Sequence, residues 1–95
     1  MGEINKNFYN NLNLLLEETS QWPSEYIFKF IIKHDKVKMK IIESIFDNTG
    51  AIIKKKHSSN NNYISISVNV IMNNPKDVIE KYKEVSKKVN DVILL

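Results

Sequence analysis

The sequence predicts an α+β domain with the ferredoxin-like order βαββαβ, a two-layer sandwich of a four-stranded antiparallel sheet with two helices on one face. Two observations predict it. Residues 63–70 alternate polar and apolar side chains with period two, as a strand with one buried face does. From Asn74-Pro75 onward the period becomes that of a helix, and the same change follows residues 26–33. The chain therefore contains two strand-to-helix units.

A short amphipathic helix or arm is expected before the first strand. Its apolar side chains stand at helical spacing over residues 5–18, and the stripe consists of Phe8, Leu12, Leu15 and Leu16. Trp22-Pro23 ends the segment, because proline disfavours a helical conformation at the residue before it. We expect an arm over residues 1–21 and a folded domain over residues 22–95. Trp22 either anchors this arm or contacts a partner.

The first strand is expected over residues 25–33. Tyr26, Phe28 and Phe30 share one face, which should meet the helices, while the lysines of the segment fall on the other. Phe28 and Phe30 are predicted to be core residues together with Phe46, whereas Tyr26 is also a candidate for an exposed contact.

The helix that follows should begin at Asp35 as its N-cap and end at Asn48-Thr49-Gly50, with Gly50 as the C′ residue. Its predicted apolar face consists of Val37, Ile41, Ile42, Ile45 and Phe46.

A hairpin is predicted next. Its strands cover residues 51–57 and 63–72, and the polar loop 58–62 joins them. The last helix has the strongest boundary in the sequence, with Asn74 as N-cap, Pro75 at the first helical position and Asp77 near the positive helix end. Its predicted buried stripe is Val78, Ile79, Tyr82, Val85, Ser86 and Val89. A short final strand is expected over residues 92–95.

Composition excludes several classes of function. Ninety-five residues make one small domain, and the absence of cysteine excludes thiol redox chemistry and cysteine-based metal sites. The longest apolar runs are much shorter than the ~20 residues of a membrane span, and no signal-peptide layout precedes them. We therefore expect a cytoplasmic protein without membrane attachment. All 14 basic residues are lysine, which weakens a nucleic-acid role because arginine supplies the bidentate recognition of phosphate and guanine.

No catalytic set is recognisable, because the base, orienter and nucleophile of activated catalysis do not occur together. We predict no enzymatic activity and no cofactor. His34-Asp35 is the one adjacent histidine–carboxylate pair, and it either forms a ligand-binding turn or reflects Asp35 as a helix cap. His57 has no second ligand at metal spacing, so no metal site is predicted.

Lys54, Lys55 and Lys56 form the densest positive run of the chain. They either contact phosphate or protect an edge strand from unwanted pairing. The topology is that of RNA-recognition domains, yet the basic-Gly-aromatic pattern of their third strand is missing from residues 61–67. The predicted open face shows mostly Ser65, Ser67 and Asn69 instead. Residues 58–62 form either a polar binding loop or a simple hairpin loop.

Three segments resemble the YbeD-like family of uncharacterised bacterial proteins. These are Pro-Ser-Glu-Tyr-Ile-Phe-Lys at 23–29, Ser-Ser-Asn-Asn-Asn-Tyr-Ile-Ser-Ile at 58–66, and Tyr-Lys-Glu-Val-Ser at 82–86 with the apolar end of the chain. The resemblance covers residues 20–95 and implies a small ferredoxin-like domain similar to ACT regulatory modules. The sequence departs from the family pattern at Ser24, where cysteine is usual, and at Ile32 and Asn61, where glycine is usual.

These observations predict a non-enzymatic regulatory module that binds a small metabolite or a protein partner and self-associates, as a dimer. The predicted ligand-binding residues are Lys29, His34, Asp35, Ser58 and Ser59. The alternative is a weak nucleic-acid binder that uses Lys54, Lys55 and Lys56. A third possibility is an adaptor whose N-terminal stripe docks on a partner.

Overall fold

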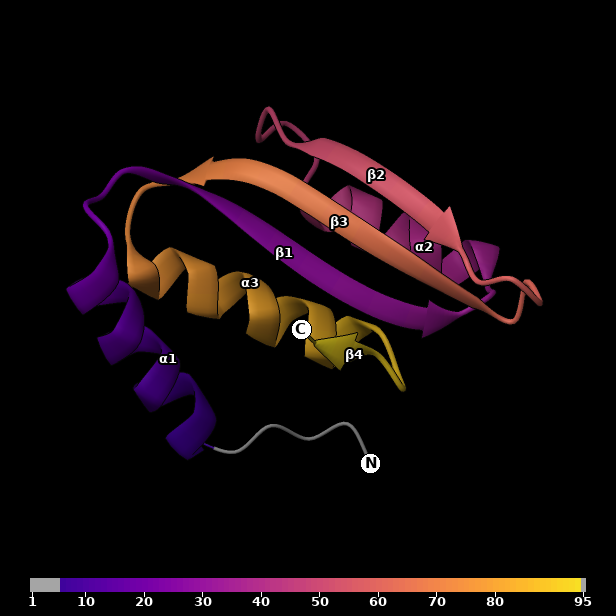
Figure 1. Ribbon diagram of the computed structural model, residues 1–95, viewed down its shortest axis with the longest axis horizontal. Coiled ribbons are helices and arrows are strands. Elements are labelled where there is room, and N and C mark those ends of the chain that lie inside the picture. The colour runs from indigo at the N-terminus through magenta and orange to yellow at the C-terminus, as the bar shows by residue number, and fades with distance from the viewer. Residues whose placement is uncertain (1–5, 95) are drawn as a thin grey trace.

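The computed structural model describes residues 6–94, which form an α+β fold of three helices and one four-stranded antiparallel sheet (Figure 1). In chain order the elements are α1 (Lys6–Thr19), β1 (Ser24–Lys33), α2 (Lys36–Ile45), β2 (Ile52–His57), β3 (Tyr63–Met72), α3 (Pro75–Lys88) and β4 (Ile93–Leu94). The strands lie in the order β2-β3-β1-β4. The predicted α+β class is therefore confirmed. Residues 1–5 of the predicted arm and Leu95 of the predicted last strand lie outside the described residues.

The central pair of the sheet is long and regular. β1 and β3 pair over ten residues each, from Ser24 opposite Met72 to Lys33 opposite Tyr63. β2 forms the predicted hairpin with β3, and it begins at Ile52. β4 pairs with only two residues of β1, Phe30 and Ile31. Since side chains alternate across a strand, this register fixes which residues share each face of the sheet.

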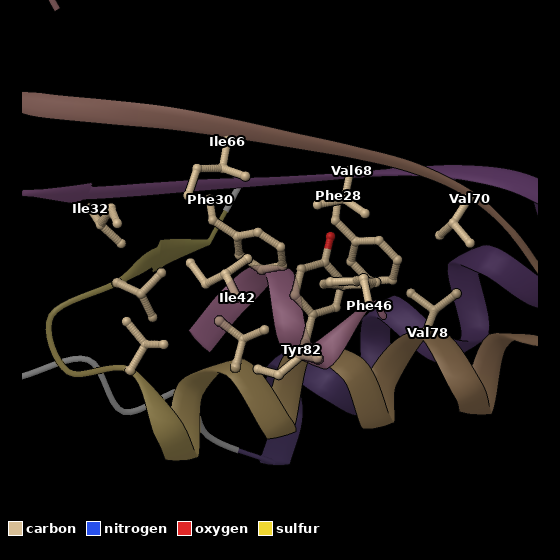
Figure 2. Packing of buried hydrophobic residues seen from close by; sticks show 14 of the residues in the cluster. Phe28, Phe30, Ile32, Ile42, Phe46, Ile66, Val68, Val70, Val78 and Tyr82 are labelled. Atoms are coloured by element: carbon tan, nitrogen blue, oxygen red, sulfur yellow. The ribbon is translucent and has the colours of Figure 1, made fainter. Parts of the chain in front are cut away.

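One face of the sheet packs against α2 and α3, and the core lies between them (Figure 2). Phe28 and Phe30 are completely buried, and the ring centroid of Phe28 lies 5.0 Å from that of Phe46, just after α2, and 5.1 Å from that of Tyr82 on α3. The prediction that the aromatic face of the first strand meets the helices, with Phe46 in the core, is confirmed. Burial of this aromatic and aliphatic surface is the main source of stability.

The second helix differs from the prediction at its end. α2 stops at Ile45, where the backbone N–H of Phe46 donates to the carbonyls of Glu43 and Ser44. Gly50 lies five residues beyond Ile45 in the following turn, with φ of +77°, so its assignment as C′ residue is wrong. Val37 was predicted on the buried face, but it is 67% exposed. Val37 lies five residues before the buried Ile42, and five residues of an α-helix turn through about 500°, which is about 140° more than one full turn. The Val37 side chain therefore points about 140° away from that of Ile42 around the helix axis.

The third helix begins where the sequence predicts. Asn74 accepts a hydrogen bond from the backbone N–H of Asp77 at 2.8 Å, and Pro75 stands at the first helical position. The predicted stripe is buried except at Ser86, which is partly exposed as a residue. The Ser86 hydroxyl is itself buried, and it has no hydrogen-bond partner among the described residues.

The first helix packs on α3 through a stripe that differs from the predicted one. Leu16 is buried and Tyr9 and Leu12 are partly buried, whereas Phe8 and Leu15 are exposed. The ammonium of Lys83 lies 5.3 Å from the Tyr9 ring centroid. The indole N–H of Trp22 donates to the carbonyl of Leu16 at 3.1 Å, so Trp22 anchors α1.

Candidate functional site

The face of the sheet opposite the helices is covered by no described element, and we call it the uncovered face. By the pairing register it carries the odd-numbered residues of β1 (25–33) and β3 (63–71), the even-numbered residues of β2 (52–56), and Ile93 of β4. Helices α2 and α3 lie together on the other side of the sheet in Figure 1. The uncovered face is therefore open to a partner.

Exposed isoleucines gather at one end of the uncovered face. Ile52 and Ile27 stand on either side of Asn69, and Ile71 is the next residue of β3 on this face. Ile52 is 63% exposed and Ile71 is 70% exposed. The sequence predicts mainly serine and asparagine here, but Ser65, Ser67 and Asn69 are partly buried between the longer side chains of β1 and β2. The isoleucines become recognisable as a group only when the strand register is known.

The lysine run of β2 is divided between the two faces of the sheet. Lys54 and Lys56 lie on the uncovered face, while Lys55 points to the helix side and its ammonium contacts the Glu43 carboxylate at 2.7 Å. The pair is partly exposed and contributes little stability. The nucleic-acid alternative requires all three lysines on one surface. Lys55 lies on the other side of the sheet from Lys54 and Lys56, so the three do not form such a surface.

The turn after β1 meets the hairpin loop. The backbone N–H of His34 donates to the carbonyl of Asn62 at 2.9 Å, and the rings of His34 and His57 lie 5.4 Å apart between centroids. Asp35 is an N-cap, since its carboxylate accepts the backbone N–H of Val37 at 2.9 Å and of Lys38 at 3.2 Å. This contact supports the structural alternative for Asp35.

Asp35→Ala is expected to lower the free energy of unfolding by about 1 kcal/mol, because two backbone N–H groups lose their acceptor. Asp35→Asn is the matched control, since asparagine caps helices about as well as aspartate. Urea denaturation of the two variants and the parent measures the difference. A loss of the same size in both variants would show that charge, not capping, is the contribution of Asp35.

Of the other predicted ligand residues, Ser58 and Ser59 lie in the loop that meets this turn, whereas Lys29 lies on the sheet. The Ser58 hydroxyl accepts the backbone N–H of Tyr63 at 3.0 Å and donates to the Asn60 side-chain carbonyl at 2.9 Å, so it closes the hairpin loop. Ser59 is exposed in the same loop. Lys29 lies on the uncovered face, about 17 Å from His34 along β1. Lys29 therefore lies apart from the other four predicted ligand residues.

Two tyrosines of the packed face, Tyr26 on β1 and Tyr82 on α3, share a hydrogen bond. The hydroxyls of Tyr26 and Tyr82 are 2.8 Å apart, and burial together with this hydrogen bond raises the pKa of Tyr82 well above its usual value of 10.0. Tyr26 is partly buried, so it belongs mainly to the packed face and not to an exposed contact. The residues from 6 to 94 contain no group of three or more histidine, aspartate or glutamate side chains that could hold a metal ion.

Hollows also open beside α3. One of about 420 Å³ lies between α1 and the start of α3, beside Tyr9, Ile79 and Lys83. Another, of about 380 Å³, lies at the end of β3, beside Ile71, Met72 and Lys81. Neither contains a predicted ligand residue.

Within residues 6–94, no helix is both long enough and apolar enough to cross a membrane.

Comparison with known proteins adds a family to this description. No curated protein and no solved structure matches the chain. One family model, described as protein of unknown function (DUF493), matches residues 17–94, a range that starts near the end of α1 and includes the whole sheet. The chain therefore belongs to the DUF493 family of proteins of unknown function, as its resemblance to the YbeD-like proteins predicted.

Proposed function

We propose that this protein is a non-enzymatic binding domain that docks a protein partner on the uncovered face of its sheet. The observation that carries the proposal is the exposed cluster of Ile27, Ile52 and Ile71 at one end of that face. Single exposed apolar residues are common, whereas exposed apolar side chains that gather at one place on a surface are typical of an interaction site. The fold does not use these three side chains in its core.

A protein partner fits this face better than the two other predicted ligands. A small metabolite needs convergent polar groups in a concave pocket, and the predicted ligand residues are spread over the turn, the loop and the sheet. Single-stranded nucleic acid needs aromatic platforms for its bases, and the one aromatic residue on the uncovered face is Tyr63 at its end. Flat, partly apolar surfaces of this kind suit another protein.

The strand order and the position of α2 and α3 support a finer fold assignment. We infer a ferredoxin-like domain similar to ACT modules, because the order β2-β3-β1-β4 with both helices on one face fits the ferredoxin-like arrangement of a βαββαβ chain. A regulatory role and self-association as a dimer remain predictions of this assignment. Stacking two uncovered faces would bring lysines of the two copies together, so we do not place a dimer contact there.

The test compares three versions of the tagged full chain as bait in nuclease-treated lysate of its own host. The parent is compared with Ile52→Ser/Ile71→Ser and with the control Val37→Ser. The exposed fraction of Val37 is 67%, a value between those of Ile52 and Ile71, but Val37 lies on α2, on the helix side of the molecule. We expect a protein that is retained by the parent and by Val37→Ser and that is lost from the double variant.

Two results would contradict the proposal. Equal retention by all three baits would show that the uncovered face is not the docking surface, and loss from Val37→Ser as well would show that capture reflects general stickiness. A defined small-molecule mass in native mass spectrometry of the parent would instead favour the metabolite prediction.

A further inference from the structure

The net positive charge of the protein is concentrated on the uncovered face. This face carries four lysines, Lys29, Lys33, Lys54 and Lys56, and one acidic residue, Glu25. The whole chain has 14 lysines and 11 acidic residues, so ten of each remain elsewhere and cancel. The face alone therefore accounts for the net charge of +3. Such a separation of charge attracts a negatively charged surface and orients it during encounter.

Two of these lysines flank a serine at the middle of the sheet. Ser67 on the central strand β3 is paired directly with Lys54 on one side and with Lys29 on the other. Directly opposite residues in antiparallel strands have Cα atoms about 4.5–5.5 Å apart, so the three side chains form one short row. Neither lysine makes an ion pair with any residue between 6 and 94. The row therefore presents two cations and a hydroxyl donor without an anion to bind.

The isoleucine row lies immediately beside the lysine row. Ile52, Asn69 and Ile27 are paired in the same way, two residues along each strand from Lys54, Ser67 and Lys29. Two residues of a strand span about 6.8 Å. An apolar surface and a cationic surface thus stand side by side at a fixed spacing.

We infer that the uncovered face recognises an acidic protein segment that carries a carboxylate and an apolar side chain about 7 Å apart. The carboxylate binds the row Lys54, Ser67 and Lys29, and the apolar side chain covers Ile52 and Ile27. An extended partner supplies this pair with residues two positions apart, and a helical partner with residues four apart, which rise about 6 Å. The inference rests on the proposed docking function and specifies its partner.

The experiment follows backbone amide resonances of the isotope-labelled full chain during titration. The probe is a short synthetic peptide in which glutamate and leucine stand two positions apart, separated by serine. A peptide with glutamine in place of glutamate is the matched probe. Lys29→Gln/Lys54→Gln is compared with Lys76→Gln/Lys87→Gln, which removes the same charge from exposed positions on α3. Inorganic phosphate and a single-stranded RNA oligonucleotide are titrated separately.

We expect the glutamate peptide to shift resonances of residues on the two rows, and the glutamine peptide to bind at least tenfold more weakly. We expect Lys29→Gln/Lys54→Gln to weaken binding at least tenfold and the α3 variant to change it less than twofold. Equal weakening by both lysine variants would overturn the inference, because general attraction would explain it. Tighter binding of phosphate or of RNA than of the peptide would overturn it in favour of those ligands.

Failure of this inference can be distinguished from failure of the docking function. If Ile52→Ser/Ile71→Ser loses a partner in the lysate experiment but Lys29→Gln/Lys54→Gln retains it, the docking surface stands and the acidic partner is wrong. If Ile52→Ser/Ile71→Ser retains every captured protein while the peptide binds through the lysine row, the row is an anion site and the docking function is wrong.

Discussion

Replacing Phe28 by alanine is expected to lower the free energy of unfolding by about 3–5 kcal/mol, enough to unfold a domain of marginal stability. Phe28 is completely buried, and it packs against the rings of Phe30 on β1, Phe46 just after α2 and Tyr82 on α3. Its removal leaves a cavity at the junction of the sheet and both helices, which those elements cannot close without losing their own contacts.

Ile27→Ala is the matched control for this substitution. Ile27 is the neighbour of Phe28 in the same strand, but it points to the uncovered face and is 51% exposed. We expect its replacement to change stability by less than about 1 kcal/mol. Chemical denaturation of both variants measures the contrast. Comparable losses at the two positions would mean that the strand itself, and not the aromatic core, is the sensitive feature.

Raising the pH above 10 is expected to destabilise the protein through Tyr82. The unfolded chain ionises this hydroxyl near its ordinary pKa of 10.0, whereas burial and the Tyr26 hydroxyl raise the pKa in the folded state. The folded state therefore keeps a proton that the unfolded state releases. The contribution of this neutral hydroxyl is complete below pH 10 and is lost as the pH rises toward the folded value. The loss approaches about 1.4 kcal/mol for each pH unit above the unfolded pKa.

Tyr82→Phe isolates this effect, because it keeps the ring and removes the ionisable hydroxyl. At neutral pH the variant is expected to be less stable by about 1 kcal/mol, since Tyr26 loses its hydrogen-bond partner. Between pH 10 and pH 12 the parent should lose about 2–3 kcal/mol more than the variant. Urea midpoints across this range measure both curves. Parallel curves up to pH 12 would show that Tyr82 ionises equally in the folded and unfolded states.

The sequence predicts the elements of this fold because their signals are local. Period-two alternation alone places Phe28 and Phe30 on the opposite face of β1 from Ile27. The helix caps are predicted because Asp35 and Asn74, whose side-chain oxygens can accept backbone N–H groups, follow directly after strands. The sequence does not predict the end of α2, because the chain leaves the helix through a tight turn at Phe46, four residues before Gly50. The stripe of α1 was misassigned because Phe8 and Tyr9 are both aromatic, and only the surface of α3 selects between them.

The candidate site is less predictable because it depends on pairing between distant segments. The run Lys54-Lys55-Lys56 looks like one patch, yet alternation sends its middle member to Glu43 on the helix side. Ser67 stands between Lys54 and Lys29 only through the register of three strands. No short pattern encodes such a register, so the row becomes apparent only in the folded sheet.

The division of each strand into a packed side and an uncovered side has a consequence for how this family can diverge. Substitutions at the even positions of β3, such as Ile66 and Val68, disturb close packing and should be eliminated by selection. Substitutions at the odd positions, such as Ser67 and Ile71, change only the outer surface. Relatives can therefore change the chemistry of the uncovered face by single substitutions on alternate residues, while the scaffold that presents these residues stays the same.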